Sequence, residues 1–240
     1  MSDGGWTADE MMTVAAARHL ADGEVCFVGI GMPSRAANLA RRTHAPGLVL
    51  VYESGTIGSK PRAVPLSIGD GELAETADAV VSVPEIFNYW LQPGRIDVGF
   101  LGAAEIDRRG DINTTVIGPY DAPRVRLPGA GGAPEIARSS GRVVVIMRHS
   151  RRALVERVGF RTSLGDRVAT VITDIGELGR DPGRDELVLT ALHPGCTADQ
   201  ARAATGWDLA VADDVAGTEP PTAGELAALR GLAAVADRVA

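Results

Sequence analysis

Short runs of strand-forming apolar residues recur along this chain, and stretches with helical periodicity lie between many of them. The runs that are typical of buried strands are 25–28, 48–52, 97–102, 143–147, 169–173 and 186–190. The helical stretches are 7–21, 34–43, 84–91, 134–137, 197–204 and 222–239. Continuous apolar strands that alternate with helices are typical of a parallel sheet covered on both faces. The pattern therefore predicts an α/β fold with a mostly parallel open sheet and helices on both faces, in a single domain over residues 1–240.

The composition excludes several classes of protein. The chain has 240 residues, 45% of them hydrophobic, which is enough for a proper core, and its net charge is −7. An acidic chain does not favour binding to nucleic acid or to an anionic membrane. Cys26 and Cys196 lie far apart without the spacing of a metal site or a disulfide scaffold, and no apolar segment is long enough to span a membrane. We therefore expect a cytoplasmic protein with no nucleic-acid or membrane partner.

The apolar run at 48–52 ends abruptly in Glu53, which is followed by Ser54 and Gly55. Reactive groups of α/β proteins commonly lie at the tip of a buried strand. A carboxylate is a weak nucleophile, but it attacks an activated acyl carbon when it is held in line and desolvated. The alternative is a solvated glutamate at a strand end. The position alone leaves both interpretations open.

Two glycine-containing turns are candidates for ligand binding. Gly29 and Gly31 follow the run at 25–28 and precede a helical stretch, and a glycine cluster follows at 129–133. Small residues let a ligand approach the main chain, and consecutive backbone N–H groups can bind an anion or a developing oxyanion. Tight packing between a strand and a helix, or a plain loop, would explain the same glycines.

Metal and cofactor chemistry is not indicated. His19, His44, His149 and His193 lie on different elements without the spacing of metal ligands, and no nucleophile elbow of a serine hydrolase is present. The glycine turns lack the full dinucleotide and nucleotide fingerprints. We expect no metal and no bound cofactor.

Several ordered motifs resemble one family nearly end to end. They are Glu10–Arg18, Phe27–Ser34, Tyr52–Gly55, Leu66–Asp78, Gly94–Ala104, Leu127–Ile136, His193–Gly195 and Ala204–Trp207. On these residues the chain resembles the β subunits of family I CoA-transferases, in the branch similar to glutaconate CoA-transferase. The segment from Arg161 to Arg167 is shorter than its counterpart in that family.

The resemblance implies a site and a mechanism. In the family the glutamate of the Glu-Ser-Gly motif attacks an acyl-CoA thioester and then carries CoA as a glutamyl thioester, so Glu53 is the expected nucleophile. The other residues implied are Gly131, Gly132 and Ala133 as N–H donors at the thioester oxygen, Gly29, Gly31, Ser54 and Gly55 as the pocket walls, and Lys60, the only lysine, as an anion contact. The chain would act with a separate α subunit, and CoA would be a substrate rather than a cofactor.

The implied reaction moves CoA from succinyl-CoA to a dicarboxylic 3-oxo acid such as 3-oxoadipate. Three alternatives stay open. The first is a CoA-transferase acting on glutaconate. The second is an acyl-CoA or ring-cleaving hydrolase on the same scaffold, in which water replaces the second acid. The third is a non-catalytic partner subunit, since a fold does not fix a function.

Overall fold

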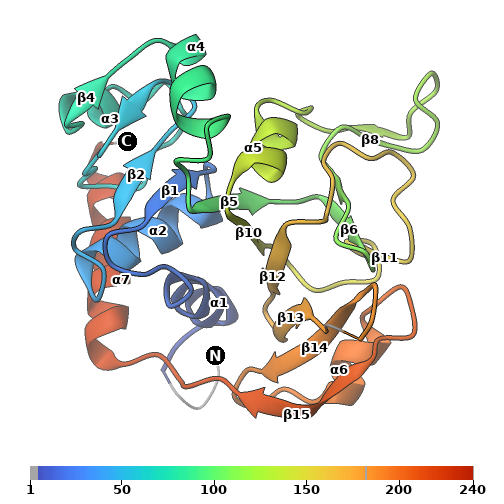
Figure 1. The fold of residues 1–240 in the computed structure, drawn as a ribbon. Coiled ribbons are helices and arrows are strands. Elements are labelled where there is room, and N and C mark those ends of the chain that lie inside the picture. The colour runs from blue at the N-terminus through green and yellow to red at the C-terminus, as the bar shows by residue number, and fades with distance from the viewer. Residues whose placement is uncertain (1–4, 182, 240) are drawn as a thin grey trace. The chain divides into compact units, whose positions relative to one another are not determined.

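The computed structural model describes residues 5–181 and 183–239, and the chain divides into two compact units (Figure 1). Unit 1 comprises Met1–Gly102, Ser139–Gly141 and Pro221–Ala240, and unit 2 comprises Ala103–Arg138 and Arg142–Pro220. The single domain that we expect over residues 1–240 stays a prediction.

Unit 1 contains parallel strands flanked by an antiparallel edge. Its strands, in sheet order, are β5 (Val98–Gly102), β1 (Val25–Val28), β2 (Val49–Val51), β3 (Thr56–Ile57) and β4 (Ala79–Val80). Strand β1 pairs in parallel with both β2 and β5, while β3 runs antiparallel to β2 and to β4. The carboxyl ends of β1, β2 and β5 therefore lie along one edge of this part of the sheet.

The helices of unit 1 begin and end where local signals place them. They are α1 (Ala8–Ala17), α2 (Met32–Arg42), α3 (Gly71–Glu75), α4 (Val83–Glu85), the π-helix η1 (Ile86–Leu91) and α7 (Ala223–Val239). The predicted capping box of α1 is present, because the Glu10 N–H donates to the Thr7 hydroxyl and the Thr7 N–H donates to the Glu10 carboxylate. Helix α1 ends earlier than predicted, since the N–H groups of His19 and Leu20 bond to carbonyls three residues back.

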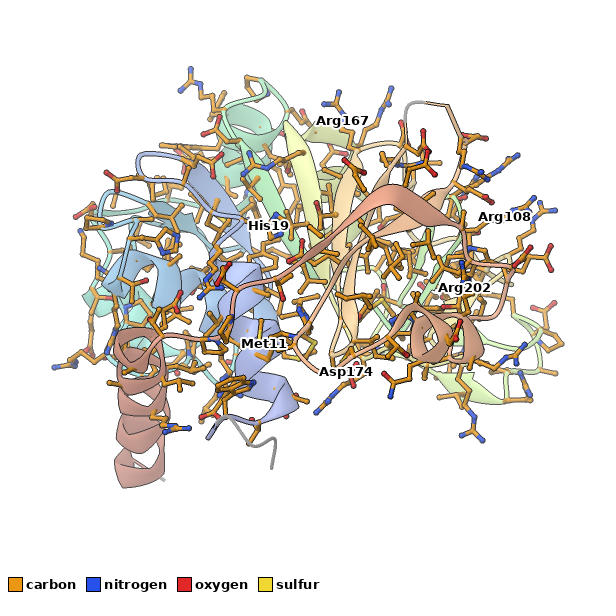
Figure 2. All side chains as sticks on the ribbon, turned by 90° about the horizontal axis from the view of Figure 1, so that it is seen from below. Met11, His19, Arg108, Arg167, Asp174 and Arg202 are labelled. Atoms are coloured by element: carbon orange, nitrogen blue, oxygen red, sulfur yellow. The ribbon has the colours of Figure 1, made fainter. Side chains whose placement is uncertain are left out.

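The core of unit 1 lies between these elements. The inner faces of α1 and α2 are buried, and so are the side chains of the parallel strands. Its largest fully buried side chains include Met12, Leu39, Phe27, Leu50 and Phe100. Met11, on the same helix as Met12, is labelled in Figure 2. This core fixes β1 and β2, the two strands that precede the predicted site residues.

Unit 2 contains a mixed sheet and two smaller sheets. The mixed sheet has the order β10 (Arg142–Ile146), β12 (Val168–Ile172), β13 (Gly176–Arg180), β14 (Leu187–Leu192) and β15 (Val211–Gly217). The smaller sheets are β11 (Leu154–Val155), β6 (Glu105–Asp107) and β7 (Ile112–Asn113), and the hairpin of β8 (Val116–Ile117) and β9 (Val125–Arg126). Its helices are α5 (Ala133–Ser139) and α6 (Ala198–Ala203).

The predicted α/β class with a mostly parallel sheet is confirmed, and the strands that the sequence did not predict have weak patterns. Strand β13 has the sequence GELGR, which carries no strand signal. Close packing requires its first glycine, because a Cβ on Gly176 would lie only 2.2 Å from the Ala191 carbonyl oxygen. Among the described residues no helix is long and apolar enough to cross a membrane.

An ion pair joins the first and last helices of unit 1. The Arg18 guanidinium donates to both carboxylate oxygens of Glu225, at 2.8 and 2.7 Å, and the two side chains are 28% and 15% exposed. Burial alone would raise the pKa of Glu225, but Arg18 and the Thr222 N–H and hydroxyl outweigh it and lower that pKa to about 2. The carboxylate is therefore more stable in the folded chain than in the unfolded chain.

We predict that Glu225→Gln lowers the free energy of unfolding at pH 7 by about 2 kcal/mol, less than the full pKa shift implies because Arg18 is partly exposed. Because the folded pKa lies below the unfolded value, the stabilisation exists above about pH 5 and disappears as the pH falls toward the folded pKa. Urea unfolding of both proteins between pH 7 and pH 3 measures this. Asp199→Asn is the control, since Asp199 is 95% exposed in its pair with Arg202. If wild type and Glu225→Gln differ in free energy of unfolding by the same amount at pH 7 and at pH 3, the stabilisation does not come from the charged Glu225 carboxylate.

Candidate active site

The predicted nucleophile lies in a tight turn between β2 and β3. The Gly55 N–H donates to the Tyr52 carbonyl at 3.0 Å, and the Tyr52 N–H donates to the Thr56 carbonyl at 3.0 Å. The chain thus reverses directly after β2, with Glu53 and Ser54 between the bonded residues. Glu53 is half-buried. The backbone is held on both sides of this half-buried residue.

The third residue of the Glu-Ser-Gly motif, Gly55, occupies a position that only a glycine fits. Its φ is +102°, and a Cβ there would lie 2.0 Å from the carbonyl oxygen of Val81. The Val81 N–H donates to the Gly55 carbonyl at 2.9 Å. A side chain larger than hydrogen is excluded by the backbone conformation and by the Val81 carbonyl oxygen. The glycine of the Glu-Ser-Gly motif therefore has a structural role that fixes the position of Glu53.

Tyr52 anchors the turn from inside the core. Its phenol lies 2.9 Å from the Ser34 hydroxyl, with which it shares a hydrogen bond, and it accepts from the Asn38 amide at 3.3 Å. All three residues are fully buried. Burial raises the pKa of Tyr52 to about 12, although the bonds to Ser34 and Asn38 lower it, so the phenol is neutral. This polar network joins α2 to the end of β2.

The two predicted glycines of the first turn lie at the same sheet edge as Glu53. Gly29 follows β1 and Glu53 follows β2, and β1 and β2 are parallel neighbours with Phe27 opposite Val51. Gly29 donates its N–H to the Phe100 carbonyl at 2.8 Å, and a Cβ there would lie 3.0 Å from that oxygen. Gly31 has a φ of +84° and open space beside it at the start of α2. Gly29 thus serves strand packing, whereas Gly31 leaves room.

Lys60 lies in unit 1 as well and has a partner. Its ammonium forms an exposed ion pair with Asp78, and its backbone N–H donates to the Thr76 hydroxyl at 3.1 Å. Gly58 has a φ of +68°, and a Cβ on it would lie 2.2 Å from the same Asp78 carboxylate. An anion at Lys60 would therefore share the ammonium with Asp78. The anion-contact role stays a prediction.

The glycine cluster belongs to unit 2, at the start of α5. The Gly129 N–H donates to the Thr114 carbonyl at 2.9 Å, and the Thr114 hydroxyl donates to the Gly129 carbonyl at 2.8 Å. Gly131 has a φ of +49°. The Ala133 N–H donates to the Ala130 carbonyl at 3.0 Å. Of the predicted donors, Ala133 thus has its N–H engaged in a turn, and the oxyanion role of Gly131 and Gly132 stays a prediction.

The structure groups the predicted residues by unit. Unit 1 holds Gly29, Gly31, Glu53, Ser54, Gly55 and Lys60, and unit 2 holds Gly131, Gly132 and Ala133. Within unit 1 the parallel pairing of β1 and β2 brings the first glycine turn and the Glu53 turn to one edge. The sequence signals assigned no structural role to Tyr52, Ser34 and Val81, because their contacts join residues distant in sequence.

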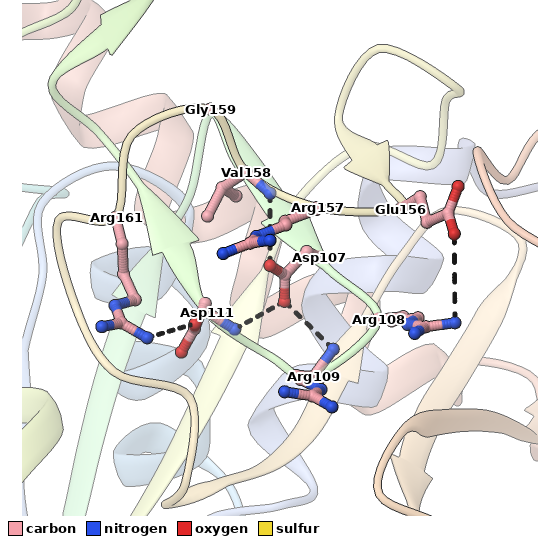
Figure 3. A pocket seen from close by; sticks show the side chains of 9 residues that line it. All are labelled: Asp107, Arg108, Arg109, Asp111, Glu156, Arg157, Val158, Gly159 and Arg161. Atoms are coloured by element: carbon pink, nitrogen blue, oxygen red, sulfur yellow. Dashed lines mark hydrogen bonds and ion pairs between the residues drawn. The ribbon is translucent and has the colours of Figure 1, made fainter.

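A cavity of about 850 Å³ in unit 2 contains none of these residues (Figure 3). It is lined by Asp107, Arg108, Arg109, Asp111, Glu156, Arg157, Val158, Gly159 and Arg161. The buried Asp107 carboxylate accepts three backbone N–H groups, those of Arg109, Asp111 and Val158. Asp111 pairs with Arg161 at 3.1 Å. The acidic groups therefore hold the cavity wall together, and we assign this cavity no catalytic role.

Two of the four histidines are buried in unit 2. His149 bonds through its ring nitrogens to the hydroxyls of Thr173 and Thr205, and His193 bonds to the Thr218 hydroxyl and the Thr173 carbonyl. Burial lowers the pKa of both. Within the described part of the chain no group of three or more His, Cys, Asp or Glu residues could hold a metal.

Comparison with known proteins relates most of the chain to one family. The family model described as coenzyme A transferase matches residues 9–204. A subunit of the 3-oxoadipate CoA-transferase of Pseudomonas knackmussii is 55% identical, over 95% of this chain and 94% of its own length.

Solved structures of similar proteins have the same fold as this chain. The structure of glutaconate coenzyme A-transferase from Acidaminococcus fermentans superposes with a TM-score of 0.88 at 28% identity, covering 95% of both chains. The decarboxylase AibA/AibB superposes with a TM-score of 0.87 at 31% identity, covering 97% of both chains. One fold thus carries both a transferase and a decarboxylase among these proteins.

We predict that Gly55→Ala destabilises the chain strongly, by about 3 kcal/mol or more, because the new methyl group would displace the Val81 carbonyl. Gly23→Ala is the matched control, since Gly23 also has a positive φ, +80°, but nothing lies within 4 Å of its Cβ position. That control should cost about 1–2 kcal/mol, the strain of the backbone alone. Urea unfolding of the two variants measures both values. Equal destabilisation would show that the contact with Val81 does not constrain the turn.

Proposed function

The chain belongs to the coenzyme A transferase family, and from this we propose that it is the glutamate-bearing subunit of an enzyme that moves CoA from succinyl-CoA to 3-oxoadipate. The observation that carries the proposal is the rigid turn that presents the Glu53 carboxylate at the carboxyl edge of parallel strands. The choice of substrates is supported by the 55% identity to a subunit of a 3-oxoadipate CoA-transferase.

The reaction uses Glu53 twice. Its carboxylate attacks the thioester carbon of succinyl-CoA, which forms a mixed anhydride and releases the CoA thiolate. The thiolate attacks the glutamyl carbonyl of the anhydride, which forms the glutamyl-CoA thioester and releases succinate. The acceptor carboxylate then attacks this thioester, which forms a second anhydride and releases the thiolate. The thiolate attacks the acyl carbon of the acceptor, which forms the new CoA thioester and frees the Glu53 carboxylate. Covalent catalysis of this kind divides one difficult transfer into easier steps.

The neighbouring residues take supporting roles in this proposal. The backbone N–H groups of Gly131 and Gly132 stabilise the negative charge that develops on the thioester oxygen, whereas the Ala133 N–H is already bonded to the Ala130 carbonyl. Gly31, beside open space at the start of α2, leaves room for the substrate. Because water would hydrolyse both the anhydride and the thioester, the assembled site must also exclude water.

The partner in this proposal is an α subunit. The relative from Pseudomonas knackmussii is named as one subunit of its enzyme, which supports a partner chain for this protein as well. CoA enters as part of a substrate, and we propose no bound cofactor. A cytoplasmic location, expected from the two cysteines, belongs to the same proposal; both are free thiols in the described structure.

The alternatives differ in what they do with the acyl group. A glutaconate CoA-transferase would follow the same chemistry with another acceptor, and the 28% identity to that enzyme supports it less than the proposed reaction. A hydrolase would release free CoA without an acceptor acid. If this chain were a non-catalytic subunit, its complex would be active without Glu53.

We predict that Glu53→Gln, co-purified with the α subunit, loses at least about 10³-fold of the transferase rate, because an amide cannot form the anhydride. Wild-type complex treated with succinyl-CoA and then hydroxylamine should carry a hydroxamate at residue 53, detected by peptide mass spectrometry. The variant should carry none.

The other outcomes separate the alternatives. Unchanged activity in Glu53→Gln would favour the non-catalytic subunit. CoA release from wild-type complex at the same rate with and without 3-oxoadipate would favour the hydrolase. Transfer to glutaconate in preference to 3-oxoadipate would correct the acceptor while leaving the mechanism in place.

A further inference from the structure

Ser54, the residue after the proposed nucleophile, has a hydroxyl with an unusual environment. Its Oγ is buried and has no hydrogen-bond partner within the described residues. Buried hydroxyl groups are nearly always bonded, because an unpaired one loses its water without compensation. A polar atom of this kind in a native structure calls for an explanation, and a bond formed only when a ligand is present is one such explanation.

The backbone around Ser54 is held on both sides of the turn. Hydrogen bonds join Tyr52 to Thr56 and Gly55 to Tyr52, and the neighbouring Gly55 is fixed against Val81 from the other side. The Tyr52 phenol is held in the core by Ser34 and Asn38. Ser54 therefore follows Glu53 on a turn whose backbone is fixed, and a fixed backbone is one condition for a preorganised donor.

The proposed reaction needs a donor at this place. Three carbonyl carbons become tetrahedral in each cycle: that of the donor acyl group, that of the Glu53 side chain and that of the acceptor acyl group. The second receives the CoA thiolate when the glutamyl thioester forms, and later the acceptor carboxylate when it breaks down. In both steps negative charge develops on an oxygen that began as a carboxylate oxygen of Glu53, and the N–H donors proposed so far serve only the thioester oxygen of the acyl group.

We propose that the Ser54 hydroxyl donates a hydrogen bond to the Glu53 acyl oxygen when CoA is attacking or leaving the glutamyl carbon. This inference rests on the proposed function. It makes Ser54 a catalytic residue rather than a wall of the pocket, and it explains why the hydroxyl lacks a partner among the described residues of the free chain. The proton stays on the hydroxyl throughout, so the donor changes the stability of the intermediate but not the balance of the reaction.

The test compares Ser54→Ala with wild type in the complex with the α subunit, in two half-reactions. One is the burst of succinate released from succinyl-CoA as the glutamyl thioester forms, and the other is the loss of that thioester when 3-oxoadipate is added. Both rates should fall about 100-fold, as when one oxyanion donor is lost, with KM unchanged. The melting temperature should stay the same or rise, because an unpaired buried hydroxyl has been removed.

Ser163→Ala is the matched control. Ser163 also has a buried Oγ without a partner in the described structure, but it lies in unit 2, where Ile112 bonds to its backbone. Its variant should keep both rates, with the same effect on the melting temperature. Ser54→Thr retains a hydroxyl and should recover at least about a tenth of the wild-type rates.

Wild-type rates in Ser54→Ala would overturn the inference, and so would a loss of rate that follows a lower melting temperature and is not recovered by Ser54→Thr. Failure of the proposed function has a different signature. In that case the wild-type complex itself forms no glutamyl thioester, whichever residue stands at position 54.

Discussion

The backbone hydrogen bond between Gly55 and Val81 fixes the position of the candidate site. It ties the turn after β2 to the residues that follow β4, and it is possible only because residue 55 has no side chain. A methyl group would lie 2.0 Å from the Val81 oxygen. With the turn fixed on this side and Tyr52 held in the core on the other, Glu53 and Ser54 have little backbone freedom. Rigid placement of a weak nucleophile is what makes its attack on an acyl carbon fast.

The parallel strands supply the second constraint. Because β1 and β2 run in the same direction and in register, the residues that follow them meet at one edge of the sheet. Open α/β sheets bind their ligands in this position, outside the carboxyl ends of the strands. The edge carries Gly31, with open space beside it, next to the turn that carries the carboxylate. The fold thus places open space and the Glu53 carboxylate at one edge of the sheet.

The sequence predicted those features that depend on neighbours along the chain. The capping box at Thr7 and Glu10 and the apolar run that ends before Glu53 are local signals, and the structure confirms both. The Val81 contact and the Asp78 partner of Lys60 were not predicted, because each joins residues many positions apart. Strand β13 was missed since its glycines are selected by close packing and not by strand propensity. The roles of the predicted site residues rest on the family resemblance, and only the local geometry could be predicted from the residues themselves.

The central claim is that Glu53 becomes covalently part of the transfer, and oxygen tracing tests it most directly. The complex is supplied with succinyl-CoA and with 3-oxoadipate whose carboxylates carry ¹⁸O, and the succinate that is released is analysed by mass spectrometry over several turnovers. If Glu53 carries the acyl bond, an oxygen of the acceptor passes to the Glu53 carboxylate in one cycle and into succinate in the next, so labelled succinate accumulates in unlabelled water. Succinate that contains only oxygen from the solvent, or no label at all while CoA is transferred, would contradict the account.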